Sequence, residues 1–584
     1  MNTQSVDTPN NFFENKVLGH PAGLFVLFFT EMWERFSYYG MRALLVLFLI
    51  SNLDKGGWHW PEENALALYG TYTSLVYLTT IMGGYLADKY LGYRWAVVIG
   101  ALLMTMGHAS MAVETPTFLY LGIGFLIFGN GFFKPNMTSI VSHIYKDHPE
   151  KKDGAYTIFY MGVNAGAFLG IMLCGYIGET VSWSWGFGLA GIFMFFGMLQ
   201  FYFTQGIFGD VGRKPTAEDK LKKAADDDGD KRVPFTTFDL VLIVASLLLG
   251  LVWILNDPYS KISGHNLLDF TALGMQGPSF TIVSGVILFL ILLVSRIMRY
   301  SKVTRDRLIA VTIFAFFTVF FWASFEQAGG SMTIFADKFT QRDFSGNAAA
   351  VFKIVNTLLT VVPLGIITFV LWKLFTQTFK KFAIGNIILG TSFVVIWGVV
   401  IWMLNNEFQK ETTTVAASWF GILNSFFIIS FAPLVSKVWE SKFNPPAAIK
   451  YGIGMTLLGL GFASLAYGAS SIVNGDASIK VSMIWLIFAY LFHTLGELCM
   501  SPVGLSYVSK LVPARMIGVM FGIWYLAIAI GNKTAGAMGG MINEITQKYS
   551  LSTFFLIFTL VPIGLGILVM LLHPLLKRLM HGVR

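Results

Sequence analysis

The sequence predicts an all-α polytopic membrane protein. Its 584 residues are 55% hydrophobic and only 13% charged, with a mean hydropathy of +0.64. A soluble protein of this composition would expose large apolar patches and would aggregate. The 59 glycines and 54 phenylalanines are typical of membrane helices, in which small residues allow close packing. Apolar runs of ~20 residues, long enough to cross a bilayer, recur along the whole chain.

These runs are expected to form about sixteen membrane-spanning helices. The first six are expected at residues 21–50, 64–91, 93–113, 117–143, 154–180 and 186–207. A charged segment follows at 209–235, and its lack of apolar periodicity predicts a solvated linker. The later spans are expected at 236–256, 279–299, 307–337, 350–372, 382–404, 415–439, 446–471, 480–509, 513–544 and 551–575.

The distribution of charge predicts how these spans are oriented. Lysines and arginines gather in alternate connections, as at 146–152 and 373–381, whereas the other connections hold scattered basic residues. This bias predicts that both termini are cytoplasmic and that the protein is a multi-pass protein of the cell membrane. It also accounts for the net charge of +8 without nucleic acid. Cys174 and Cys499 lie in apolar runs and show no metal-binding or disulfide spacing.

One short turn indicates how the spans are grouped. The segment "GGYLADKYLGYR", Gly83–Arg94, resembles the signature loop between the second and third helices of the major facilitator superfamily. That superfamily has two six-helix bundles around a central cavity. The resemblance implies an N-terminal bundle at residues 1–207 and a C-terminal bundle at 305–584. A linker and inserted transmembrane hairpin would occupy 208–304, and a second inserted hairpin at about 350–404 would interrupt the second bundle.

Charged residues lie inside several of the apolar runs. The first run carries four, and Lys134, Glu326 and Glu497 lie in later ones. With the two hairpins set aside, the charges fall on the first, fourth, seventh and tenth helices. In the major facilitator architecture that this chain resembles, internal repeats relate these four helices, and they line the cavity. Each unpaired charge would cost about 2.5–3.5 kcal/mol at a helix centre, so we expect the charges to pair or to face water. Four glutamates and three cations would give the cavity a net charge of −1 if all were ionised, so one carboxylate could take up a proton.

The first helix concentrates these charges on one face. Glu31, Glu34, Arg35 and Arg42 fall within an arc of about 100°. Arg35 can pair with Glu31 one turn earlier. We expect Glu31 or Glu34 to be the proton-responsive carboxylate, with Arg35 as its conditional partner.

Several motifs together resemble the proton-dependent oligopeptide transporters, the POT/PTR family of the major facilitator superfamily. Glu31-x-x-Glu34-Arg35 resembles the signature of their first helix. "GNGFFKPN" at 129–136 and "FYMGVNAGAF" at 159–168 resemble their fourth and fifth helices. "FWASFEQAGG", "GELCMSPVGLS" and "FGIWYL" resemble the seventh, tenth and eleventh. The sequence is therefore identified as resembling a bacterial di-/tripeptide:proton symporter.

The resemblance implies import of di- and tripeptides with protons by alternating access. Such a protein is no enzyme and needs no metal or other cofactor, and we expect it to function as a monomer. A peptide carries an amino group and a carboxylate, which suits a cavity with cations on one side and a carboxylate on the other. The residues expected to hold the peptide carboxylate are Tyr39, Arg42 and Lys134, and those expected at the amino end are Asn164, Asn424 and Glu497.

Further roles follow from the same resemblance. Arg42 with Glu326 would close the outer gate, and Lys134 with Glu497 the inner gate. The other expected substrate contacts are Tyr38, Tyr77, Tyr160, Trp322, Glu326, Ser501 and Trp524. The sequence also departs from the family, since Ser425 follows Asn424 where a proline is usual, and the hairpin at 350–404 is not part of the common pattern.

Other functions fit the sequence less well. An anion such as nitrate is the alternative substrate, but the acid-rich first helix argues against a site for anions alone. A membrane enzyme would need a zinc-ligand spacing, a nucleophile elbow or a phosphate-binding loop, and none is present in a suitable context. A channel would need a repeated filter loop, which is also missing.

Overall fold

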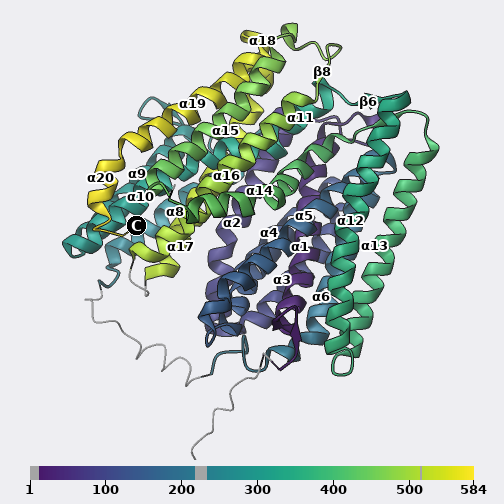
Figure 1. The fold of residues 1–584 in the computed structure, drawn as a ribbon. Helices are drawn as coiled ribbons and strands as arrows, with labels where there is room; N and C mark the ends of the chain where they lie inside the picture. Colours follow the sequence, from purple (N-terminus) through teal and green to yellow (C-terminus); the bar gives the residue numbers. More distant parts are fainter. Residues whose placement is uncertain (1–11, 13, 217–232, 443, 513–515, 584) are drawn as a thin grey trace, which may run out of the picture. The chain divides into compact units, whose positions relative to one another are not determined.

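The computed structural model describes residues 12, 14–216, 233–442, 444–512 and 516–583, which are largely helical (Figure 1). Its long helices are α1 (Ala22–Ile50), α2 (Glu62–Leu86), α3 (Tyr93–Met111), α4 (Pro116–Ile144), α5 (Lys152–Thr180), α6 (Trp183–Thr204), α8 (Thr237–Ser263), α9 (Gly277–Met298), α10 (Lys302–Phe325), α12 (Gly346–Thr378), α13 (Ala383–Gln409), α14 (Ile422–Glu440), α15 (Ala447–Ala469), α16 (Ile484–Leu511), α17 (Ile517–Gly540) and α19 (Leu551–Leu571).

The remaining elements are short. They comprise α11 (Ser331–Phe339), α18 (Ile542–Lys548), α20 (His573–Leu579) and the strands β1 (Lys16–Val17), β2 (His20–Pro21), β3 (Thr271–Ala272), β4 (Met275–Gln276), β5 (Thr340–Gln341), β6 (Asp343–Phe344), β7 (Thr413–Thr414) and β8 (Val481–Ser482). The pairs β1–β2, β3–β4 and β6–β7 are antiparallel, and β5–β8 is parallel. Twelve of the described helical segments are apolar and long enough to cross a membrane, and α1, α2, α3 and α17 match them in length. The polytopic helical fold is thereby confirmed.

The predicted span at 307–337 lies within one helical segment of membrane-spanning length, Lys302–Phe339, but that segment is interrupted. Helix α10 ends at Phe325, a 3₁₀ turn runs over Glu326–Gly329, and α11 begins at Ser331. Glycines are poor helix formers, and Gly330 takes a non-helical conformation with φ −121° and ψ −106°. Hydropathy does not register such a break. Most of the predicted linker, residues 217–232, lies outside the described residues.

Contacts divide the chain into two compact units. Among the described residues, unit 1 comprises those within 12–44, 79–216 and 342–429, and unit 2 comprises those within 45–78, 233–341 and 430–583. Helices α1, α2 and α14 each begin in one unit and end in the other. The hairpin α8–α9 belongs to unit 2, and the hairpin α12–α13 belongs to unit 1.

Glycines allow the helices of each unit to pack closely. In unit 1, a Cβ added to Gly100 on α3 would lie 2.6 Å from the carbonyl oxygen of Gly129 on α4. In unit 2, a Cβ added to Gly452 on α15 would lie 2.6 Å from the carbonyl oxygen of Gly566 on α19. Close approach of this kind stabilises membrane helices through van der Waals contact, because no hydrophobic force drives association within lipid.

The hairpin α12–α13 is fixed to unit 1 by apolar and polar contacts. The Phe393 ring on α13 packs edge-on against Phe29 of α1, with ring centroids 5.6 Å apart. At the end of α13, buried Glu407 accepts hydrogen bonds from the Tyr176 hydroxyl at 2.7 Å and from Lys410 Nζ at 2.5 Å. Tyr176 lies on α5, so the second inserted hairpin is bound to helices encoded far before it in the sequence.

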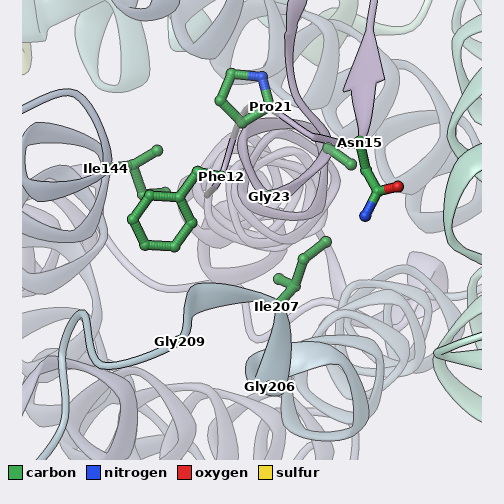
Figure 2. Close-up of a pocket in the computed structure, with 9 residues that line it drawn as sticks. Phe12, Asn15, Pro21, Gly23, Ile144, Gly206, Ile207 and Gly209 are labelled. Carbon is green, nitrogen blue, oxygen red and sulfur yellow. The ribbon is translucent and has the colours of Figure 1, made fainter. Parts of the chain in front are cut away.

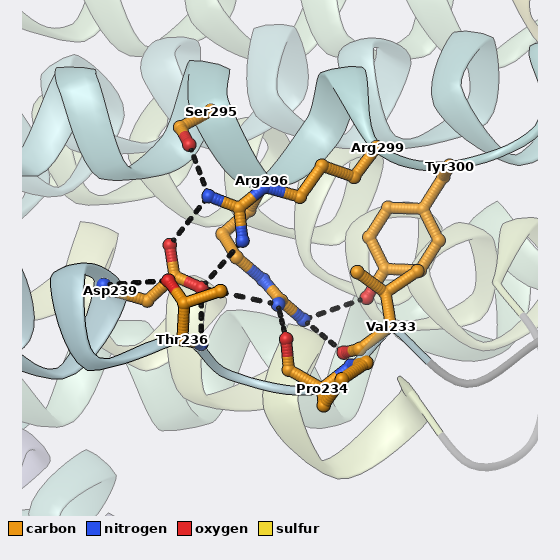
Figure 3. A network of polar contacts seen from close by, with 8 residues as sticks. All are labelled: Val233, Pro234, Thr236, Asp239, Ser295, Arg296, Arg299 and Tyr300. Atoms are coloured by element: carbon orange, nitrogen blue, oxygen red, sulfur yellow. Dashed lines mark hydrogen bonds and ion pairs between the residues drawn. The ribbon is translucent and has the colours of Figure 1, made fainter.

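The hairpin α8–α9 is closed at its base by the polar network in Figure 3. Thr236 and Asp239 form a capping box, with Asp239 N donating to Thr236 Oγ1 at 3.2 Å. Arg299 at the end of α9 donates to both Asp239 oxygens, at 2.7 and 3.0 Å. Arg296 donates to the carbonyl of Pro234 at 2.8 Å. These bonds join the start of α8 to the end of α9.

Candidate functional site

A buried ion cluster occupies the polar face of α1. Glu31, Glu34 and Arg35 are 4%, 0% and 4% exposed. Arg35 Nε lies 3.1 Å from Glu31 Oε1, as the one-turn spacing predicts, and Arg35 also forms an ion pair with Glu34. Gly166 on α5 makes room for this cluster, because a Cβ there would lie 2.1 Å from the carbonyl oxygen of Met32.

Helix α4 supplies two further groups to the cluster. Asn130 Nδ2 donates to Glu34 Oε1 at 2.9 Å. Lys134, one turn later on α4, acts electrostatically on both Glu31 and Glu34. Glu31 Oε2 has no hydrogen-bond partner among the residues that the structure describes. The cluster therefore contains a carboxylate oxygen that can carry a proton without breaking a hydrogen bond.

The same face of α1 continues with aromatic and basic groups. The guanidinium of Arg35 lies 5.4 Å from the Tyr38 ring, and that of Arg42 lies 5.7 Å from the Tyr39 ring. The two tyrosine rings meet edge-on at 5.1 Å. Cation–π contacts of this kind stabilise a cation where water is scarce.

Two expected substrate residues lie on α5. Asn164 is buried and donates through Nδ2 to the Tyr160 carbonyl at 2.9 Å, and Tyr160 is 56% exposed. Asn424, the second expected residue with an amide side chain in unit 1, lies on α14 and is half-buried.

In unit 2, the 3₁₀ turn between α10 and α11 places Glu326. This carboxylate is 3% exposed and accepts a hydrogen bond from the Tyr69 hydroxyl at 3.1 Å. Next to it, Gln327 Nε2 donates to the Ala535 carbonyl of α17 at 2.9 Å, which fixes the turn against that helix. The break in the helix therefore sets the position of the Glu326 side chain.

The other expected residues of unit 2 lie on several helices. Trp322 on α10, Tyr77 on α2 and Glu497 on α16 are half-buried, and Trp524 on α17 is buried. The Tyr77 and Tyr525 rings have centroids 6.1 Å apart. Ser501 on α16 has a buried hydroxyl without a hydrogen-bond partner in the described part of the chain.

The expected gate partners fall in different units. Arg42 and Lys134 belong to unit 1, whereas Glu326 and Glu497 belong to unit 2. Their pairings, and the substrate contacts, stay predictions.

The sequence analysis missed several polar residues that the structure brings into these sites. Asn130 binds Glu34, Tyr69 binds Glu326, and Lys533 on α17 pairs with Asp257 on α8. Asn130 could have been noticed, because it lies one turn before Lys134 inside a quoted motif. Lys533 is a single charge in a long apolar run, which is itself a signal of function.

A small pocket of about 180 Å³ lies at the start of α1 (Figure 2). Its lining residues are Phe12, Asn15, Pro21, Ala22, Gly23, Ile144, Gly206, Ile207 and Gly209. None of the residues expected to bind substrate lines it. Within the described ranges, no three His, Cys, Asp or Glu side chains gather as metal ligands would.

Comparison with known proteins identifies the family. The profile of PTR2, the POT family, matches residues 94–226 and 398–556. The peptide transporter YePEPT of Yersinia enterocolitica subsp. palearctica is 30% identical, over 99% of this chain and 98% of that protein. A di-/tripeptide transporter of Lactococcus lactis subsp. cremoris is 28% identical, over 98% and 99%. A crystal structure of the peptide transporter POT in complex with sulfate matches with a TM-score of 0.68 and 29% identity, over 98% and 99%. The chain is therefore a membrane transporter, not an enzyme, and belongs to the POT family.

Proposed function

We propose that this transporter imports di- and tripeptides together with protons, as a monomer in the cell membrane with both termini in the cytoplasm. The observation that carries the proposal is the cluster on α1, in which one arginine pairs with two buried glutamates. The substrate class is supported by the relatives in Yersinia and Lactococcus, which are named as transporters of peptides and of di- and tripeptides.

The electrostatics of this cluster suggest how peptide and proton are coupled. Glu31 and Glu34 carry two negative charges, and Arg35 and Lys134 carry two positive charges. When Lys134 turns to the carboxylate of a peptide, the glutamates keep Arg35 as their cation and retain one excess negative charge. One proton relieves that excess. Glu31 Oε2 is suited to carry it, because it has no hydrogen-bond partner among the described residues and the ion pairs with Arg35 are made by Glu31 Oε1 and Glu34 Oε2. Peptide binding and proton binding therefore support each other.

The remaining site residues divide between the two ends of the peptide. Arg42, Lys134 and Tyr39 would bind its carboxylate, and Glu497, Asn164 and Asn424 its amino group. The other proposed contacts are Tyr38, Tyr77, Tyr160, Trp322, Glu326, Ser501 and Trp524. Alternating access would then follow from making and breaking two ion pairs, Arg42 with Glu326 on the outside and Lys134 with Glu497 on the inside.

Uptake by reconstituted vesicles tests this proposal. Vesicles containing the purified protein are given an inward proton gradient, and labelled dialanine is followed with and without a protonophore. Accumulation that the protonophore abolishes, and that unlabelled di- and tripeptides inhibit but free alanine does not, is the expected result. Uptake that reaches only equilibration under the gradient would refute proton coupling. Uptake that dipeptides fail to inhibit would refute the substrate class.

A further inference from the structure

Lys533 is a buried cation that the proposed transport mechanism does not use. It lies in the apolar helix α17, with 1% of its side chain exposed. Its ammonium group pairs with Asp257 of α8 and donates to Thr71 Oγ1 of α2 at 2.8 Å. It also lies 5.7 Å from the centroid of the Trp253 ring on α8. A lysine at the centre of a membrane helix costs about 2.5–3.5 kcal/mol when unpaired, so these partners are what make its position tolerable.

A second pair extends this contact toward the start of α2. Asp257 Oδ1 lies 3.2 Å from Lys261, and Lys261 lies 3.1 Å from Glu63 of α2. Two cations and two carboxylates thus form a chain with no net charge. The Thr71 hydroxyl also donates to the Ile254 carbonyl of α8 at 3.2 Å. Helix α8 therefore contacts α2 at two places, through Glu63 in the first turn of α2 and through Thr71 about two turns later.

Helices α2 and α17 are also packed directly against each other. A Cβ added to Gly70 would lie 2.7 Å from the Cα of Gly536, so the two backbones are in contact. Asn532 Nδ2 donates to the Thr73 carbonyl at 3.1 Å. Residues 62–78 of α2 consequently cluster with unit 2, although α2 runs on into unit 1 at residue 79. Any motion that separates α2 from α17 must break the contacts of Lys533.

We propose that Lys533, Asp257 and Thr71 form a lock that holds α2 to α17, and that the inserted helix α8 belongs to this lock because it supplies the counter-ion. The inserted hairpin α8–α9 would then take part in the transport cycle, because the contacts of Asp257 affect how easily α2 and α17 separate. The inference goes beyond the proposed function, because it depends neither on the peptide nor on the proton.

Disulfide cross-linking in the full-length protein tests the lock. A Cβ at Gly540 of α17 would lie 3.5 Å from the Cα of Glu63 on α2, close enough for a disulfide between cysteines at the two positions. Glu63→Cys and Gly540→Cys are introduced together, with Cys174→Ala and Cys499→Ala to remove the native thiols. The vesicles are treated with a mild oxidant, and the fraction cross-linked is measured on gels.

The double variant Asp257→Asn/Lys533→Gln removes both buried charges of the lock. Lys261 loses Asp257 and Glu63 as partners in this background, but its side chain is 26% exposed and can be solvated, so the variant is expected to fold. We expect its ratio of linked to unlinked protein to fall about fivefold or more relative to the parent. Asp269→Asn is the matched control, because it makes the same chemical change in an exposed loop of the same hairpin, and it should leave the ratio unchanged. An unchanged ratio in the double variant would overturn the proposal, and so would an equal fall in the control. Neither result would decide whether the substrate is a peptide or whether its transport is coupled to protons.

Discussion

Replacing Glu31 by glutamine should separate peptide exchange from proton-driven accumulation. Glutamine keeps the shape of the side chain and an oxygen that can accept from Arg35, but it cannot exchange a proton. Both oxygens of Glu34 are engaged, one by the amide of Asn130 and the other by the ion pair with Arg35. Glu31 Oε2 has no hydrogen-bond partner among the described residues, and the ion pair of Glu31 with Arg35 is made by Oε1. The structure therefore favours Glu31 over Glu34 as the carboxylate that carries the proton.

The distances show why the cluster survives this change. At 3.1 Å between Arg35 Nε and Glu31 Oε1, Coulomb's law with an effective dielectric constant of about 20 gives ~5 kcal/mol. Because Glu34 also pairs with Arg35, losing the charge of Glu31 still leaves the arginine held by a second carboxylate. We therefore expect Glu31→Gln to fold and to bind peptide.

The Glu31→Gln substitution should change the ratio of internal to external dialanine that a proton gradient supports. An inward gradient of one pH unit stores about 1.4 kcal/mol per proton, which supports roughly tenfold accumulation of a peptide carried with one proton. In Glu31→Gln we expect this ratio to fall to about one, because no free energy of the proton gradient reaches the peptide. Exchange of external labelled dialanine for internal dialanine should continue, since it needs no net proton movement.

Both quantities are measured in vesicles of the same preparation. Glu150→Gln serves as the control, because it removes a carboxylate whose side chain is 62% exposed in a loop. It should accumulate dialanine as the parent does. Full accumulation by Glu31→Gln would refute the assignment to Glu31, and full accumulation by Glu34→Gln as well would refute coupling through this cluster.

Three further predictions concern other contacts. Tyr69→Phe removes the hydroxyl that donates to Glu326. A hydrogen bond to a charged group contributes about 1.5–3 kcal/mol, so initial uptake should fall about tenfold or more. Unchanged uptake would contradict a transport role. Glu407→Gln should lower the free energy of unfolding by about 1–3 kcal/mol, seen as a lower Tm, without changing the KM for dialanine. Burial, and then Lys151, lower the pKa of His20 below 6.5, so its docking against Tyr145 should weaken as pH falls below about 6.5, and limited proteolysis of the N-terminal segment should increase there but not in His20→Gln.

The features that could be predicted from the sequence are local ones. A membrane span needs only a run of apolar residues, so most of the long helices begin and end within about five residues of their predicted positions, although α8 ends seven residues later and α14 begins seven residues later than predicted. The polar face of α1 and the pairing of Glu31 with Arg35 follow from the 3.6-residue period of a helix. The 3₁₀ turn at Glu326, within the span expected at 307–337, was not predicted because hydropathy averages over a break that ends in the glycines at 329 and 330.

The features that could not be predicted join distant parts of the chain. Asn130 and Glu34 are 96 positions apart, and Lys533 and Asp257 are 276 positions apart. Periodicity places each of these residues on a helix face, but it does not say which faces meet. The attachment of α12–α13 to unit 1 through Glu407 has the same origin, because that hairpin follows α10 and α11 of unit 2 in the sequence.

The two buried clusters differ in a way that assigns them different tasks. The chain from Lys533 to Glu63 contains two cations and two carboxylates in direct contact, so its charge is balanced whatever is bound elsewhere. The cluster on α1 has two carboxylates and one arginine on its own helix, so its charge is balanced only while Lys134 acts on it from α4. Protonation of the α1 cluster should therefore depend on whether Lys134 acts on it. The ion pairs of the lock, in contrast, should change only when the helices separate. Changes at Lys533 should alter the rate of transport at every pH by a similar factor, and changes on α1 should alter how that rate depends on pH.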